Sequence, residues 1–321
     1  MNRIVAVAIA QRNGKLRIKT SADLRDLKRV RVRPYLRGLV QGLDVRGHHL
    51  GKDYDIEFRQ RKAADIDRPT FDNYQSGDPL VIFCMSTTVV AKAKDLVGSP
   101  TPIVGIVSEP TLEQFDTVTN ICGVSAKRSQ TAGECFGRFL RTVPTLTEVR
   151  VLHKPGYGPS DRALSKVRTA AAAMSPPVTV TPVPITTAAD IEDAIDAMHA
   201  RDVDNPATVG IQVLPVDVCL GHAQDIIDLA QGEKKLPTFF PVPDWVKPDE
   251  ASAIGAYGVP QRRCGQLMAE RVDAIWKNGG TVPGAGFARW TEAPADAFEF
   301  VASTAAAHEL NIKLHPSIPR V

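Results

Sequence analysis

The stretch Leu80-Val-Ile-Phe-Cys-Met-Ser-Thr-Thr-Val-Val90 decides the fold of this chain. It begins as a short, wholly apolar run, passes the small hydroxyl residues Ser86, Thr87 and Thr88, and continues in a helical pattern. A strand with so few polar positions is typical of a parallel sheet that is covered by helices on both faces. The stretch therefore predicts an α/β fold, with these hydroxyls at the carboxyl end of a buried strand.

The same three hydroxyl residues also begin a helix. The first turn of a helix has free backbone N–H groups and the positive end of the helix dipole, which together attract an anion. In the alternative interpretation, one hydroxyl only caps the helix. The sequence alone leaves both interpretations open.

Strand-like and helix-like segments alternate along most of the chain, and the pattern occurs twice. A chain of 321 residues is too long for one ordinary core, and two successive runs of βαβ units predict two doubly wound, Rossmann-like lobes joined by a hinge. The expected strands are 1–10, 54–58, 80–85, 102–107 and 120–124 in the first lobe, and 149–153, 178–183, 207–214 and 237–240 in the second. The expected helices are 36–47, 87–97, 126–142, 160–174, 187–198 and 217–231.

Composition excludes several classes of protein. With 43% hydrophobic and 23% charged residues, the chain has the balance of a soluble globular protein. A formal net charge of +3 is too small to indicate a nucleic-acid partner, and no apolar run is long enough to insert into a membrane. The five cysteines form no Cys-x-x-Cys pair and no cluster with histidine, so we expect core residues and no metal site.

Enzyme signatures are mostly absent from the sequence. Gly156-Tyr-Gly-Pro-Ser-Asp161 lies between a strand and a helix, as a dinucleotide-binding loop does, but Asp161 would repel a pyrophosphate. No nucleophile elbow, Walker loop or His-Glu-x-x-His motif occurs. We therefore expect a protein that is not an enzyme and that carries no cofactor.

Polar and aromatic residues follow the ends of several expected strands in both lobes. Ligands bind at this edge of a doubly wound sheet, and small-molecule sites are usually clefts lined by a few convergent polar groups. The sequence therefore predicts a ligand site in a cleft between the lobes. The candidate ligand-binding residues are Ser86, Thr87, Thr88, Ser108 and Glu109 in the first lobe, Tyr157, Ser160, Asp217, Asp244 and Trp245 in the second, and Tyr257 in the segment that returns after it.

Several local sequences, in the right order, resemble one protein family. They include Tyr35-Leu-Arg-Gly-Leu39, Pro102-Ile-Val-Gly-Ile-Val-Ser-Glu-Pro110, Asn120-Ile-Cys-Gly-Val-Ser125 and Gly255-Ala-Tyr-Gly-Val-Pro260. The family is that of the ABC-transporter substrate-binding proteins related to the tryptophan/tyrosine-binding type, and the likeness covers roughly residues 30–321. The chain departs from the family in its longer, more basic loop after the first strand and in its start, which lacks the usual export signal.

The resemblance implies a type I periplasmic-binding-protein fold whose lobes close over a solute like a venus flytrap. Residues 1–125 with 254–283 would form one lobe, residues 126–253 with 284–321 the other, and three crossings would form the hinge. An ABC permease would be the protein partner, and the chain itself would be a monomer or weak dimer. The location would be periplasmic if an export signal is missing from this sequence, and cytoplasmic otherwise.

The resemblance also gives the candidate residues roles toward a small amino-acid-like or carboxylate ligand, which could be aromatic. Residues 86–88 would donate to a carboxylate, and Asp217 or Asp244 could balance an ammonium group. Tyr157, Trp245 or Tyr257 could cover an apolar body. Two alternatives stay open: a cytosolic ligand sensor of the same fold that acts on a regulator, and a two-lobed nucleotide-sugar enzyme.

Overall fold

The computed structural model describes residues 2–9, 14–26, 33–67, 70–71, 81–97, 101–246 and 252–321. The chain divides into two compact units, a first unit of Met1–Lys127 with Gln261–Pro294 and a second unit of Arg128–Pro260 with Ala295–Val321. The chain thus passes from one unit to the other three times. No helix among the described residues is long and apolar enough to span a membrane.

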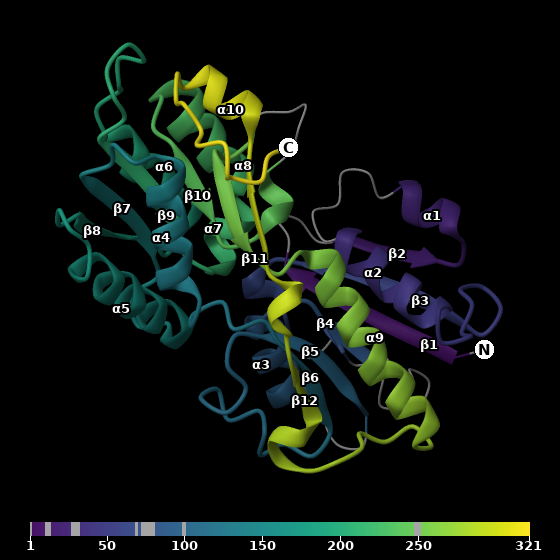
Figure 1. The fold of residues 1–321 in the computed structure, drawn as a ribbon. Helices are drawn as coiled ribbons and strands as arrows, with labels where there is room; N and C mark the ends of the chain where they lie inside the picture. Colours follow the sequence, from purple (N-terminus) through teal and green to yellow (C-terminus); the bar gives the residue numbers. More distant parts are fainter. Residues whose placement is uncertain are drawn as a thin grey trace. The chain divides into compact units, whose positions relative to one another are not determined.

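A seven-stranded sheet forms the centre of the first unit, in the order β12-β6-β5-β4-β1-β3-β2 (Figure 1). Its strands run parallel except for β2, which is antiparallel to β3. The strands are β1 (Asn2–Ile9), β2 (Gly14–Ile18), β3 (Tyr54–Arg61), β4 (Val81–Cys84), β5 (Ile103–Val107), β6 (Ile121–Ser125) and β12 (Trp290–Glu292). The helices are α1 (Ser21–Asp26), α2 (Arg33–Asp44), α3 (Thr87–Leu96) and α9 (Gln261–Lys277).

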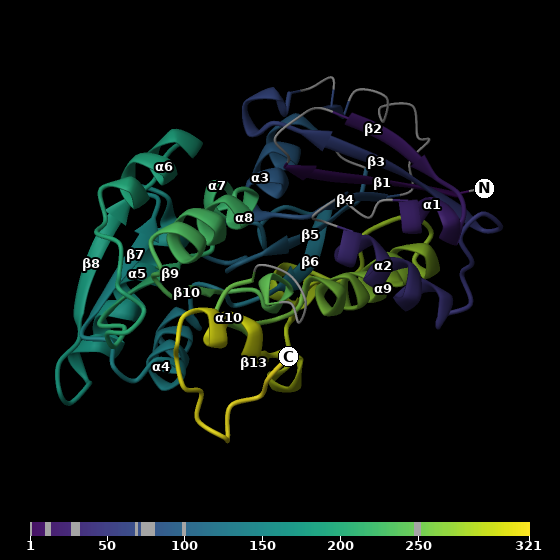
Figure 2. The same ribbon diagram turned by 90° about the horizontal axis from the view of Figure 1, so that it is seen from above.

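Helices cover both faces of this sheet, as the apolar run predicts. All four side chains of β4 are fully buried. Figure 2 shows α3 on one face of the sheet, and α2 with α9 on the other. Leu80, the first residue of the run, lies outside the described residues.

The helices α2 and α9 pack unusually closely. A Cβ atom on Gly38 of α2 would lie 2.0 Å from the carbonyl oxygen of Arg262, and one on Gly265 of α9 would lie 2.1 Å from that of Tyr35. Because such contacts are far inside van der Waals distance, only glycine permits this approach. The predicted apolar residues of α2, namely Leu36, Leu39 and Leu43, are fully buried.

A six-stranded sheet forms the centre of the second unit, in the order β13-β11-β10-β9-β7-β8. Only β13 is antiparallel to its neighbour, β11. The strands are β7 (Glu148–His153), β8 (Thr179–Pro184), β9 (Val209–Val213), β10 (Thr238–Phe240), β11 (Gly255–Gly258) and β13 (Glu299–Ala302). The helices are α4 (Ala132–Thr142), α5 (Gly158–Ala172), α6 (Ala188–Asp196), α7 (Asp217–Gly221), α8 (Ala223–Ile226), the π-helix η4 (Ile227–Glu233) and α10 (Thr304–Glu309).

Several helix boundaries differ from the predicted ones for local reasons. The helix expected at 126–142 begins only at Ala132, because Lys127 adopts a left-handed backbone with φ 51° and the chain turns there. The helix expected at 217–231 is interrupted at His222, whose ψ of 25° is not helical. The predicted start of α6 is confirmed, since Thr187 and Asp190 form a reciprocal capping box.

The borders of the units also differ from the predicted lobe boundaries. Residues 254–260 belong to the second unit, because β11 pairs with β10 and β13. Residues 284–294 belong to the first unit, because β12 pairs with β6. Both strands are too short for their pairing to be visible in the sequence.

The two units repeat one strand order. In the first unit it is β3-β1-β4-β5-β6, and in the second it is β8-β7-β9-β10-β11. The order reverses between β1 and β4 and between β7 and β9, and ligands bind beyond the carboxyl ends of the strands at such a reversal. Residues 10–13, which follow β1, lie outside the described residues.

Candidate functional site

The predicted hydroxyl cluster of the first unit lies at the carboxyl ends of β4 and β5. The Ser86 hydroxyl caps α3, because it accepts a hydrogen bond from the Val89 N–H at 3.3 Å. The Thr87 hydroxyl accepts one from the Ser108 N–H, also at 3.3 Å. The capping interpretation is therefore confirmed for Ser86, while Thr87 ties two neighbouring strand ends together.

A third strand end joins this cluster through Ser125, which sequence reasoning missed. Its hydroxyl at the end of β6 donates to the carbonyl oxygen of Ser108 at 2.9 Å, and its side chain is buried. Glu109, the residue after Ser108, is also buried. Thr88 is half-buried in the first turn of α3. The signal for Ser125 was its place at the end of the motif that begins at Asn120.

Charged side chains fill one face of β3, which the sequence predicts only as an alternating strand. Asp55 and Glu57 are 2% and 8% exposed, and Arg59 is 2% exposed. Asp55 accepts hydrogen bonds from Arg17 Nε at 2.8 Å and Arg3 Nε at 3.3 Å. Arg17 therefore reaches this face from the neighbouring strand β2.

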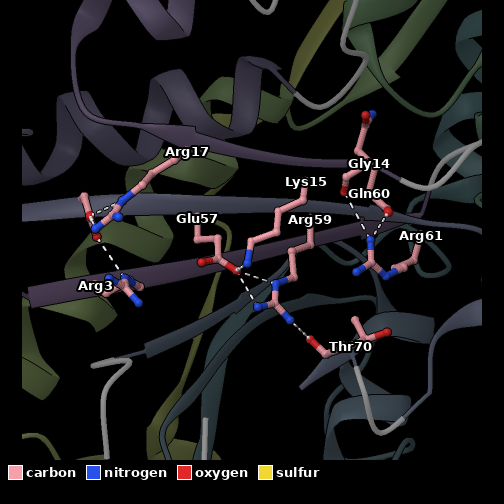
Figure 3. A network of polar contacts seen from close by, with 10 residues as sticks. Arg3, Gly14, Lys15, Arg17, Glu57, Arg59, Gln60, Arg61 and Thr70 are labelled. Atoms are coloured by element: carbon pink, nitrogen blue, oxygen red, sulfur yellow. Dashed lines mark hydrogen bonds and ion pairs between the residues drawn. The ribbon is translucent and has the colours of Figure 1, made fainter. Parts of the chain in front are cut away.

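Glu57 and Arg59 form the buried centre of this network (Figure 3). Arg59 Nε donates to Glu57 Oε1 at 2.6 Å, and its terminal nitrogen donates to the carbonyl oxygen of Thr70 at 2.7 Å. Lys15 Nζ lies 3.0 Å from the same Glu57 oxygen. Burial alone would raise the pKa of Glu57, but the contacts with Lys15 and Arg59 outweigh it and lower the pKa.

A polar pocket of about 790 Å³ lies beside the network, at the carboxyl end of β3. Its walls carry both signs of charge, from Lys15, Arg61, Asp65 and Asp67. Arg61 is held by the Gly14 carbonyl oxygen at 3.2 Å, and Thr70 donates to Asp67 at 3.0 Å. Charges at every second position of β3 were the sequence signal for this region.

In the second unit, Tyr157 ends the loop after β7, and Ser160 lies in the first turn of α5. The chain turns at Gly156, which has a φ of 72°, and the fully buried Ser160 hydroxyl accepts from the Lys154 N–H at 2.9 Å. Ser160 therefore holds the turn in place. Tyr157 is half-buried, and Lys154 Nζ lies 5.9 Å from the centroid of its ring.

The other candidates of the second unit follow β9 and β10. Asp217 is half-buried at the first position of α7, and Asp244 lies in the 3-10 turn Pro243–Trp245. Trp245 is only 8% exposed, and its ring lies 6.3 Å from that of Phe240. Since β7, β9 and β10 are parallel neighbours, these loops leave the sheet at the same edge.

His153 is a second residue that sequence reasoning missed. It is the last residue of β7, and its buried Nδ1 atom has no hydrogen-bond partner among the described residues. Burial lowers its pKa, so the neutral form is favoured. No sequence motif marks this position.

Tyr257 occupies a different place from the one predicted. It lies on β11 of the second unit, so it does not belong to the segment that returns to the first unit. Its hydroxyl donates to Glu134 Oε2 at 2.8 Å, and the Arg138 guanidinium carbon lies 4.2 Å from its ring centroid. Both partners belong to α4.

The five cysteines are buried and free, which confirms the prediction of core residues. Burial raises the pKa of the Cys135 thiol to about 12. In the described ranges, no group of three or more His, Cys, Asp and Glu side chains could hold a metal ion.

Several solved structures resemble the whole chain. A conserved domain protein from Vibrio cholerae matches with a TM-score of 0.74 and 18% identity, over 98% of this chain and 96% of that chain. The ABC domain from Streptococcus pneumonia, solved in complex with L-Trp, matches with a TM-score of 0.69 and 14% identity over 100% of both chains. An ABC transporter solute-binding protein from Agrobacterium vitis, bound with alpha-D-tagatopyranose, has a TM-score of 0.57 and 13% identity, over 94% of this chain and 95% of that chain.

The chain has the fold of the solute-binding proteins of ABC transporters. The predicted fold of two α/β lobes is thereby confirmed, whereas no family model and no curated protein matches the sequence. Proteins of this fold bind different solutes, since one relative holds L-Trp and another a sugar. The Agrobacterium vitis relative is named as a solute-binding protein.

Proposed function

We propose that this protein is the solute-binding component of an ABC uptake transporter and that it binds a small amino-acid-like or carboxylate ligand. The observation that carries the proposal is the repeated strand order, which reverses at β1/β4 and at β7/β9. In both units, polar side chains follow the strands next to the reversal. Ligands of doubly wound sheets bind at this position.

In the first unit, the ligand carboxylate would bind at the start of α3. The backbone N–H groups of the first turn and the half-buried Thr88 hydroxyl would donate to it, and the helix dipole would add to the attraction. Thr87 and Ser108 position this turn through their own hydrogen bond. Glu109, the residue after Ser108, lies at the same edge of the sheet.

In the second unit, Asp217 or Asp244 would balance an ammonium group, and Tyr157 or Trp245 would cover an apolar body. Ser160 keeps the Tyr157 turn in place. A solute that contacts both units would bind the closed form better than the open form. It would then shift the population toward closure by that difference in affinity alone.

We propose an ABC permease as the protein partner. The solute would pass to this permease outside the cytoplasm. The fold supports the transporter role, since two of the relatives are named for ABC systems. The amino-acid-like ligand class rests on the residues of this chain, because the relatives bind chemically different solutes.

A thermal-shift screen over amino acids, aromatic acids, small carboxylates and monosaccharides tests the ligand class. A ligand present at a hundred times its dissociation constant stabilises the native state by about 2.7 kcal/mol. Stabilisation by monosaccharides alone would contradict an amino-acid-like ligand. A response to none of the panel would contradict the solute-binding role for these classes.

Titration calorimetry with the best ligand tests the site. We expect Thr87→Val and Asp244→Asn each to weaken binding by more than about tenfold. The matched controls Thr169→Val and Asp193→Asn, both on exposed helix positions, should bind normally. Unchanged affinity in both test variants would remove this assignment, and a radius of gyration unaltered by ligand in solution scattering would contradict closure.

A further inference from the structure

A pocket of about 390 Å³ in the second unit has no role in the solute site proposed above. It lies between α4, the strands β11 and β13, and the C-terminal segment. Its walls combine two cations with three aromatic rings and a hydroxyl, from Arg138, Arg141, Tyr257, Phe298, Phe300 and Ser317. Of these, only Tyr257 was a candidate for the solute site.

The position of Arg138 in this pocket is fixed by its neighbours. Tyr257 and Phe300 are directly opposite in the antiparallel β11–β13 pair, so their side chains lie on the same face of the sheet. The Arg138 guanidinium carbon lies 4.2 Å from the centroid of the Tyr257 ring and 5.1 Å from that of Phe300. Cation–π contacts of this kind hold a guanidinium in place over the rings.

Glu134 fixes the Tyr257 ring through the ring's hydroxyl. It lies one helical turn before Arg138 on α4, and its Oε2 atom accepts the hydrogen bond of the Tyr257 hydroxyl at 2.8 Å. The carboxylate is thus occupied by the ring that supports Arg138. The arrangement resembles the shell of supporting contacts that preorganises a binding site.

One hydrogen-bond donor in this pocket lacks an acceptor in the part of the chain that the structure describes. Arg138 Nε is buried and has no hydrogen-bond partner among the described residues. A buried donor without an acceptor is destabilising, and a ligand oxygen would offset that cost. Arg138 and Arg141 against Glu134 also leave one positive charge, which favours a ligand with a single negative charge.

We propose that this pocket binds a small organic monoanion, namely a carboxylate carried on an apolar or aromatic body. Guanidinium groups pair with carboxylates in a forked geometry, and these charged hydrogen bonds are stronger than neutral ones. Phe298 and Phe300 would pack against the apolar body. The volume lies in the range of pockets for small molecules.

Benzoate is the probe for the test, with benzyl alcohol as its neutral counterpart. Titration calorimetry on the full chain should detect benzoate binding, with benzyl alcohol at least about tenfold weaker. In a ¹⁵N NMR spectrum, the Arg138 Nε–H resonance, identified by its loss in Arg138→Gln, should shift on addition of benzoate. Absence of binding at 20 mM benzoate, or equal binding of the neutral compound, overturns the proposal.

Substitutions of the two pocket arginines test where benzoate binds. Arg138→Gln should weaken benzoate binding by about tenfold or more, and Arg141→Gln by several-fold. Arg168→Gln, which removes the same charge from an exposed position on α5 of the same unit, should bind like the wild type. If Arg138→Gln does not fold, Arg138→Lys replaces it and should bind several-fold more weakly, because lysine lacks the fork. Wild-type affinity in the Arg138 and Arg141 variants overturns the proposal.

The variant Thr87→Val distinguishes binding in this pocket from binding at the proposed solute site. This variant should bind benzoate with unchanged affinity, whatever its effect on the transported solute. If it loses benzoate binding while Arg138→Gln keeps it, the probe occupies the solute site and the proposal is wrong. The two proposals can therefore fail separately.

Discussion

Two ion pairs of the same composition and spacing occur in the two units, and they differ in burial. Glu57 and Arg59 lie two residues apart on β3, and Glu148 and Arg150 lie two residues apart on β7. In both pairs the arginine Nε donates to the glutamate Oε1, at 2.6 Å and 3.1 Å. The side chains of the first pair are 2% and 10% exposed for Arg59 and Glu57, against 29% and 28% for Arg150 and Glu148.

The difference shows that the cover over the sheet, and not the local sequence, sets the burial of such a pair. Both pairs lie on a strand next to an edge strand, β3 beside β2 and β7 beside β8. The first pair has Lys15 of β2 at 3.0 Å from Glu57 and the Thr70 carbonyl oxygen as an acceptor for Arg59, whereas the second has the Thr181 hydroxyl of β8, which donates to Glu148 at 3.0 Å. A buried charge that loses its partner is costly, whereas an exposed ion pair contributes little.

The largest expected effect comes from breaking the buried pair. Glu57→Ala leaves Arg59 buried without its carboxylate, and we expect it to lower the free energy of unfolding by about 3–5 kcal/mol. Glu148→Ala is the matched variant and should cost about 1 kcal/mol or less. Urea-induced unfolding of both variants measures the two losses. Equal losses would contradict the role that we assign to burial.

A second, smaller effect concerns pH. Because the folded pKa of Glu57 lies below its ordinary value of 4.5, its contribution to stability is fully present above pH 4.5 and is lost as the pH falls through the folded pKa. Glu57→Gln carries no such titration. We therefore expect the stability difference between wild type and Glu57→Gln to shrink as the pH falls below 4.5. A difference in the free energy of unfolding between the two proteins that stays constant from pH 6 to pH 3 would contradict this expectation.

The smallest effect on stability is expected at the edge strand β8. The Thr179 and Ile185 N–H groups bond to the backbone beside β7, so by the two-residue period the position of Pro182 faces away from β7. Pro182→Val restores an N–H at this open edge and should change the free energy of unfolding by less than about 0.5 kcal/mol. It should also increase self-association, since proline protects exposed edges.

Sedimentation velocity at several concentrations measures the self-association of Pro182→Val. Thr181→Pro is the control, because the Thr181 position faces β7 and its N–H is needed in the ladder. We expect a much larger loss of stability for Thr181→Pro than for Pro182→Val. Similar losses for both would show that the assigned edge is wrong.

The sequence alone was sufficient to predict most of the parallel strands and where they end. Apolar runs such as the one through β4 predict strands buried on both faces, and the residues after them can be placed at one edge of the sheet. The prolines in residues 178–183 are typical of an edge strand, and β8 lies at the edge of its sheet. The strand β2 was missed, because its basic residues resemble a solvated loop.

The contacts that shape the candidate site were harder to predict from the sequence, because they join residues far apart in the chain. Asp55 and Arg17 are separated by 38 positions, and Tyr257 and Glu134 by 123. Alternating polarity indicates a strand but does not say whether its polar face meets water or a neighbouring strand. Several basic residues of the segment before α2, namely Lys28, Arg29 and Arg31, lie outside the described residues.

The close contact of α2 with α9 has a consequence for the synthesis of this protein. Ribosomes release the chain from its N-terminus, so the Gly38 surface of α2 emerges more than two hundred residues before its partner Gly265. Residues 128–260, which lie between them, supply five of the six strands of the second sheet. The middle of the nascent chain can thus condense first, and the Gly38 surface of α2 has no α9 to pack against until residues 261–277 are translated.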